Sequence, residues 1–126
     1  MSSQQHDRGL EMRKQVMGAS HVERTLAATD QYTEALQQLV NEFCWGAVWA
    51  RPGLEPRIRC MLTVTMLTAL NRSTELQTHI RAALGNGVTR EEIVEIMLQA
   101  GVYCGMPAAV EGLRVARAVF AEAAAA

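Results

Sequence analysis

Apolar side chains recur every three to four residues along most of the chain, which is the spacing of amphipathic helices. The pattern predicts a first helix over about residues 8–17 that ends at Gly18, followed by a loop that holds His21. A second helix is predicted to begin at Asp30, because an aspartate side chain accepts hydrogen bonds from the free amides of a first helical turn. Its apolar residues keep helical spacing and lead into a segment that ends at Trp49.

The centre of the chain holds its longest apolar segment. Residues 51–57 contain two prolines and one glycine, and they predict a turn. Residues 56–70 then predict a helix that is apolar almost all round. Such a helix lies at the centre of a fold or in a subunit interface.

Capping signals divide the next part of the chain. Thr74 with Gln77 and Thr89 with Glu92 are each spaced as a capping box, in which side chains bond the free amides at a helix start. Residues 85–87, Gly-Asn-Gly, predict the end of the first of these two helices.

The second capped helix is predicted to reach about residue 103. Pro107 then suits the first turn of a last helix that ends near residue 123. The sequence therefore predicts an all-α fold, a compact single domain over residues 1–126 with five to six helices and no strand. Residues 1–7 are predicted to form a flexible tail.

Composition excludes several classes of partner. The 126 residues are 49% hydrophobic with a formal net charge of -1, and no basic block suggests a nucleic-acid partner. The longest apolar stretch, residues 60–70, is about half of the ~20 residues that a membrane span needs. The N-terminus lacks an apolar signal segment, and the three cysteines form no CxxC pair. We therefore expect reduced thiols, no membrane partner and a cytoplasmic location.

Two histidines are candidates for proton chemistry. Glu75 and His79 lie four residues apart, on one face of a predicted helix, where the carboxylate can orient the imidazole as a general acid or base. A solvated surface pair is the alternative. His21 lies in a predicted loop, where it is either functional or simply exposed. The three histidines carry no metal-ligand spacing, so no metal is expected.

Two tryptophans and two arginines are candidates for binding. Trp45 and Trp49 lie four apart and Arg51 follows them, so they can wall a pocket and grip a carboxylate, or form a core cluster with an exposed arginine. Arg59 stands near the start of the apolar helix. A cation gains nothing from the dipole there, so Arg59 is expected to hold an anionic partner or to pair with a glutamate.

Three stretches resemble the carboxymuconolactone decarboxylase family. They read GLEMRKQVMGASHVER from residue 9, WGAVWARPGLEPRIRCMLTVTMLTALNRSTELQTHIRAALGNGVTREEIVEI from residue 45, and VYCGMPAAVEGLRVAR from residue 102. The resemblance covers about residues 8–122. It implies an alkylhydroperoxidase D-like helical fold, subunits that form a ring, usually a homohexamer, a carboxylated lactone as small-molecule partner, and no cofactor.

The resemblance also implies a reaction. The family's carboxy-lyases convert 4-carboxymuconolactone into the β-ketoadipate enol-lactone and CO2 in the catabolism of protocatechuate, an aromatic acid. The resemblance and the residue types together suggest that Arg51 and Arg59 hold the retained carboxylate. His79, with His21 as a second candidate, stabilises the enolate oxygen and delivers the proton.

The same superfamily contains redox enzymes with a CxxC motif followed by a histidine. When that histidine is placed on His79, Arg72 and Glu75 occupy the two cysteine positions, and Cys60 stands where the redox enzymes carry a glutamate. Arg72 joins the predicted substrate-binding residues, and Glu75 the catalytic ones. Two alternatives remain open, a thiol-dependent alkylhydroperoxidase-like redox protein and a non-catalytic helical assembly.

Overall fold

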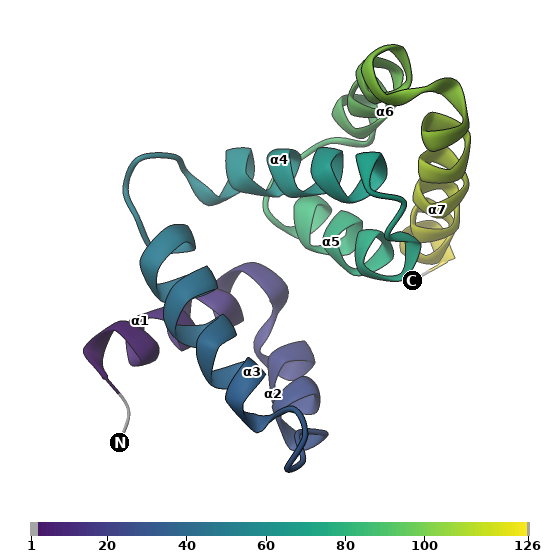
Figure 1. Ribbon diagram of the computed structural model, residues 1–126. Helices are drawn as coiled ribbons and strands as arrows, with labels where there is room; N and C mark the ends of the chain where they lie inside the picture. The colour runs from purple at the N-terminus through teal and green to yellow at the C-terminus, as the bar shows by residue number, and fades with distance from the viewer. Residues whose placement is uncertain (1–2, 126) are drawn as a thin grey trace. The chain divides into compact units, whose positions relative to one another are not determined.

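Helices form along nearly the whole chain, and the computed structural model, which describes residues 3–125, has no strand in that range (Figure 1). The all-α prediction is confirmed. In chain order the elements are α1 (Gln4–Met17), α2 (Ala19–Ala27), α3 (Glu34–Leu39), the π-helix η1 (Val40–Trp49), α4 (Pro56–Ala69), α5 (Ser73–Gly85), α6 (Arg90–Cys104) and α7 (Met106–Ala125). None of these helices is long and apolar enough to cross a membrane.

The chain divides into two compact units, Met1–Pro56 and Arg57–Ala126, called here the N-terminal and the C-terminal unit. In the N-terminal unit α1 packs along η1, and the two backbones approach closely at Gly9 and Gly46. A β-carbon on Gly9 would overlap the carbonyl oxygen of Asn41, and one on Gly46 would overlap that of Gln5. Only glycine lets two helices meet at this distance.

In the C-terminal unit α7 packs against both α5 and α6. The core side chains with the least exposure include Leu76, Ile80, Ile93, Met97 and Val119. Gly112 of α7 again allows close packing, because a β-carbon there would lie 2.5 Å from the sulfur of Met97 and 3.0 Å from Cγ2 of Thr68.

The start of the chain is more helical than predicted. α1 begins at Gln4, because the side chain of Ser3 accepts a hydrogen bond from the backbone N–H of His6 at 2.9 Å. Residues 4–7, predicted as part of a tail, are therefore helical, whereas Met1 and Ser2 lie outside the described residues. α1 ends at the predicted position, where Gly18 takes a φ of 94°.

The predicted loop around His21 is wrong, because α2 starts directly after Gly18 and includes His21. Val22 gives the reason, since its side chain is fully buried and anchors this short helix. The predicted second helix is also displaced. Asp30 accepts hydrogen bonds from the backbone N–H groups of Tyr32 and Thr33 in a turn, and α3 begins only after that turn.

The two predicted capping boxes have different outcomes. Thr89 and Glu92 form theirs, with hydrogen bonds of 3.0 and 2.9 Å between each side chain and the other residue's backbone N–H. Thr74 caps nothing, because α5 already begins at Ser73 and its N-cap residue Arg72 makes no side-chain cap bond. The preceding turn runs through Asn71 at a φ of 58°, which brings the helix start forward.

Candidate functional site

Three of the predicted site residues lie at the start of α5. Arg72 is exposed at the N-cap position, Glu75 is exposed in the first turn, and His79 follows one turn later. His79 is half-buried, and its Nδ1 atom is buried. The helix therefore presents a carboxylate to solvent and an imidazole that reaches into the protein from the same face. This arrangement suits a histidine held in one orientation.

Arg59 lies in the first turns of α4, in the same unit. Its Nε atom is buried and has no hydrogen-bond partner among the described residues. Arg57, two residues earlier, differs, because its guanidinium pairs with Glu92 and also donates to the carbonyl of Gly87. A buried N–H group without an acceptor costs about 1–3 kcal/mol. Arg59 therefore has a donor that a bound anion can use, whereas Arg57 fastens the start of α4 to the α5–α6 turn and α6.

The predicted aromatic wall is a stacked pair in the N-terminal unit. The ring centroids of Trp45 and Trp49 lie 4.6 Å apart with an angle of 29° between the ring planes. Both belong to η1 and are buried, at 4% and 7% exposure. π-Helical turns are rare in proteins, and those that occur often lie at functional sites. The pair thus fills the core of its unit, and Arg51 follows it as an exposed side chain just beyond the helix end.

His21 completes the predicted set. It lies in α2, half-buried, and its carbonyl accepts a hydrogen bond of 3.0 Å from the hydroxyl of Thr25. The predicted residues are therefore divided between the units. Those of the N-terminal unit are His21, Trp45, Trp49 and Arg51, and those of the C-terminal unit are Arg59, Arg72, Glu75 and His79. Their roles remain predictions.

The thiols of Cys44 and Cys60 are poorly suited to redox catalysis. All three cysteines are free, and burial raises the pKa of Cys60 to about 11. Burial also raises the pKa of Cys44, against the opposing effect of Arg13. A nucleophilic cysteine needs a lowered pKa, because the thiolate is the reactive form. Within residues 3–125 no group of three potential ligands is placed to hold a metal ion.

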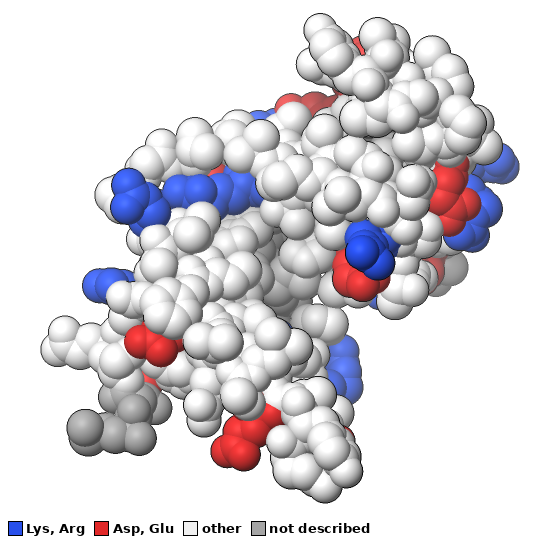
Figure 2. All heavy atoms as spheres, viewed as in Figure 1, with Lys and Arg blue, Asp and Glu red and all other residues white. Residues whose placement is uncertain are grey.

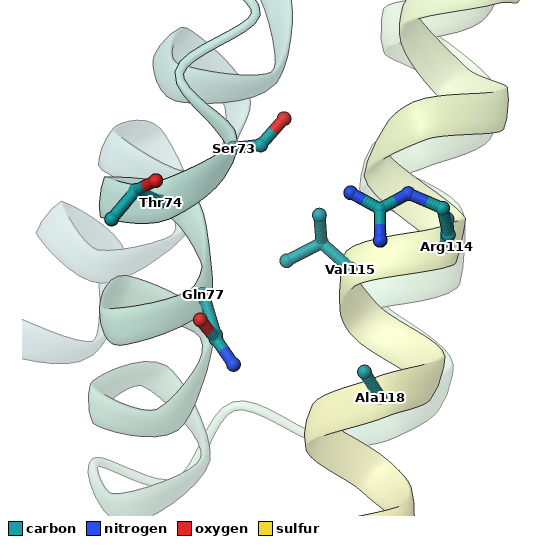
Figure 3. Close-up of a pocket in the computed structure, with 6 residues that line it drawn as sticks. All are labelled: Ser73, Thr74, Gln77, Arg114, Val115 and Ala118. Carbon is teal, nitrogen blue, oxygen red and sulfur yellow. The ribbon is translucent and has the colours of Figure 1, made fainter.

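The sequence analysis missed a polar pocket between α5 and α7. Its volume is about 150 Å³, and Arg114 of α7 points across it toward Ser73 and Gln77 of α5 (Figure 3). Glu111 of α7 connects two of the lining residues, since its carboxylate accepts hydrogen bonds from Ser73 at 2.6 Å and from Arg114 at 2.6 and 2.8 Å. The Glu111–Arg114 spacing of three residues was the available signal, and it indicates a surface ion pair as readily as a site.

The sequence analysis also missed Arg13, a buried charged residue of the N-terminal unit. Nothing in the sequence around Arg13 distinguishes a buried arginine from an exposed one on an amphipathic helix. On the face shown in Figure 2, basic and acidic side chains form small separate groups on a mostly uncharged surface.

Comparison with known proteins identifies the family to which the chain belongs. Residues 34–118, more than half of the chain, match the model of the carboxymuconolactone decarboxylase family. The chain is 39% identical over 117 residues to a 4-carboxymuconolactone decarboxylase of Acinetobacter baylyi, which covers 93% of this chain and 87% of that protein. It is 41% identical over 109 residues to the nitrosuccinic acid decarboxylase npaB of Metarhizium robertsii, covering 86% and 76%. The chain belongs to the carboxymuconolactone decarboxylase family.

Proposed function

We propose that this protein is a carboxy-lyase that converts 4-carboxymuconolactone into the β-ketoadipate enol-lactone and CO2, in the catabolism of protocatechuate. One observation carries the proposal. A relative named for decarboxylation of this lactone is 39% identical over 93% of the chain, so the likeness includes both units. The raised pKa of Cys60 speaks against the thiol-dependent alternative.

The substrate supplies its own electron sink. The bond between the ring carbon and the departing carboxylate breaks, and its electron pair moves through the ring double bond to the lactone carbonyl oxygen. CO2 leaves, and the resulting dienolate takes up one proton on the ring carbon next to the lactone carbonyl, so that the double bond now includes the carbon that lost CO2. The protein must hold the retained carboxylate, stabilise the enolate oxygen and deliver that proton.

The C-terminal unit supplies donors for two of these tasks. Arg59 suits a carboxylate or an enolate oxygen, because its buried Nε–H lacks an acceptor among the described residues. His79 suits the proton transfer, since its side chain is half-buried and its Nδ1 atom lies in the protein interior. Glu75 orients the imidazole, and exposed Arg72 adds positive charge at the helix start.

The N-terminal unit supplies a cation and an apolar element. Arg51 grips the retained carboxylate from the end of η1, and His21 is the second candidate for the proton donor. Trp45 and Trp49 exclude water, because their stacked rings form a rigid apolar block. Removing water from a carboxylate favours its loss as neutral CO2.

A second substrate should be tested beside the first, because the relative named nitrosuccinic acid decarboxylase is 41% identical over 86% of the chain. Nitrosuccinate also bears two carboxylates. One of them is on the carbon next to the nitro group, so the electron pair released with CO2 moves onto a nitro oxygen. The same three tasks apply, with a nitronate in place of the enolate.

An ultraviolet assay with coupled CO2 detection distinguishes the two substrates. We expect turnover of 4-carboxymuconolactone, insensitive to chelators, with kcat/KM at least tenfold above that for nitrosuccinate. The reverse preference would assign the protein to the nitrosuccinate reaction. Peroxide-dependent thiol oxidation without turnover of either acid would replace the proposal with the redox alternative.

We further propose that the protein assembles as a homo-oligomer, a hexamer by its resemblance to ring-forming relatives. Exposed apolar residues support self-association. Val94, Leu98 and Val102 follow one another at four-residue spacing on α6, with Val102 71% exposed. Contiguous apolar surface of this kind marks protein–protein contacts.

A further inference from the structure

The α1–η1 seam holds a buried cation with neutral partners. Arg13 of α1 is 9% exposed, and its Nη1 donates to Oε1 of Gln37 at 2.9 Å and to Oδ1 of Asn41 at 2.8 Å. Both acceptors are amide oxygens without charge. Nη1 of Arg13 is therefore hydrogen-bonded, but neither partner carries a negative charge that would balance the guanidinium.

No anion within the described residues compensates that charge. Their ion pairs involve His6, Arg57, Arg81 and Arg114, and Arg13 is not among them. Burial lowers the pKa of Arg13, and the charge interaction that opposes this effect comes from Cys44. Burial raises the pKa of Cys44 itself, so its thiol stays protonated near neutral pH. A buried charge without a partner costs several kcal/mol, and such groups are concentrated at functional sites.

The guanidinium also keeps its best edge for an anion. Arginine has five N–H donors, and both hydrogen bonds that Arg13 makes among the described residues start from Nη1. The edge formed by Nε and Nη2 presents two parallel N–H groups. A carboxylate accepts two parallel hydrogen bonds from such an edge, whereas a spherical anion such as chloride does not match it.

We infer that Arg13 is a carboxylate-binding residue, and that its ligand is the retained carboxylate of the dicarboxylic substrate. The identity of the ligand rests on the proposed function, whereas the carboxylate chemistry rests on the guanidinium and its surroundings. Gln37 and Asn41 fix the side chain through Nη1, which leaves the free edge in a constant orientation. Because a desolvated arginine binds more strongly than an exposed one, Arg13 contributes more to affinity than exposed Arg51.

The direct test observes Arg13 in the wild-type protein. Its Nε–H resonance is assigned by through-bond NMR on labelled full-length chain, and sodium succinate is titrated against sodium chloride at constant ionic strength. We expect a saturable shift of this resonance with succinate and none with chloride. A resonance that stays in place with succinate up to tens of millimolar overturns the inference.

The kinetic test uses Arg13→Lys, which keeps the charge and loses the two-pronged geometry. We expect KM for the dicarboxylic substrate to rise about 10- to 100-fold, with kcat changed far less. Arg24→Lys is the matched control, because Arg24 lies in α2 of the same unit, is exposed and bonds Ser20. A folded Arg13→Lys protein with the wild-type KM overturns the inference.

The two tests separate this inference from the proposed function. If the wild-type protein turns over neither acid, the proposed function fails, and the succinate titration still decides whether Arg13 binds a carboxylate. If turnover is normal while succinate does not shift the Arg13 resonance, the inference about Arg13 is wrong and the proposed function stands. If Arg13→Lys does not fold, the titration of the wild-type protein decides between binding and no binding.

Discussion

His79 is the side chain on which the proposed chemistry depends most. A positioned general acid contributes about 10²–10⁴-fold to a rate. We expect His79→Ala to lower kcat by that factor while the far-ultraviolet circular dichroism stays that of the wild type. Thr78→Ala, the neighbouring position on α5, is the control and should keep kcat. A folded His79→Ala enzyme with near-normal kcat would remove His79 from the chemistry.

Glu111 makes the stability of the fold depend on pH in the acid range. Hydrogen bonds from Arg114 and then Ser73 lower its pKa from 4.5 to about 2. A carboxylate whose pKa is lower in the folded than in the unfolded protein stabilises the fold at pH values above its unfolded-state pKa. This stabilisation is lost as the pH falls toward the folded-state pKa. We expect the midpoint of thermal unfolding to fall between about pH 4.5 and 2, and to fall less in Glu111→Gln.

Glu91→Gln serves as the matched control for Glu111. Glu91 is an exposed carboxylate on α6 that makes no ion pair among the described residues. Its replacement should leave the acid-induced loss of stability as large as in the wild type. Equal acid sensitivity in Glu111→Gln would contradict the assignment of this pH dependence to the Glu111–Arg114–Ser73 contacts.

At the scale of the elements, the α6 start is held by a cap that the α5 start lacks. Replacing a capping threonine by alanine costs about 1 kcal/mol. We therefore expect Thr89→Ala to lower the free energy of unfolding by about that amount. Thr74→Ala should change it little, because Thr74 makes no cap bond. Urea denaturation measures both, and an equal loss in the two variants would argue against this difference.

The crossing of α1 and η1 depends on glycine. In Gly9→Ala the new β-carbon would overlap the carbonyl oxygen of Asn41 and lie 2.5 Å from the backbone nitrogen of Gly46. Overpacking of this kind costs about 1–3 kcal/mol or more. We expect a large loss of stability in thermal unfolding. Gly85→Ala should be neutral or stabilising, because a β-carbon there meets nothing within 4 Å.

The elements also show where sequence reasoning succeeds. The helical class, the α1 end at Gly18 and the Thr89 box follow from local rules, since each depends on residues a few positions apart. The Thr74 box failed because Asn71 adopts a positive φ, a choice that the spacing of Thr74 and Gln77 does not reveal. The change from α3 to the π-helix η1, which packs along α1, was not predicted from the spacing of apolar residues.

The candidate site was only partly accessible to the same reasoning. His79 and Arg59 were selected by residue type and spacing, and the buried state of their ring and guanidinium atoms came only with the fold. Arg13 was not selected, because burial and neutral partners distinguish it and neither is visible in the sequence. Tyr32 and Leu36, two of the apolar residues at helical spacing in the predicted second helix, are exposed, at 84% and 57%.

At the scale of the whole molecule, the proposed assembly can be tested through α6. A charge on the exposed apolar stripe should oppose self-association. We expect the wild-type protein to sediment as a hexamer and Leu98→Glu to shift it to smaller species without loss of helix content. Glu95→Gln, on the same helix and exposed, should leave the mass unchanged. A monomeric wild-type protein would contradict the assembly.

The stacked pair of Trp45 and Trp49 also makes the protein its own spectroscopic reporter. The chain has two tryptophans, and both lie in the N-terminal unit. Tryptophan emission therefore follows the melting of Met1–Pro56 alone, whereas circular dichroism at 222 nm follows the helices of both units. At a centroid separation of 4.6 Å the two indoles couple excitonically, so loss of that signal dates the opening of η1 within the unfolding sequence.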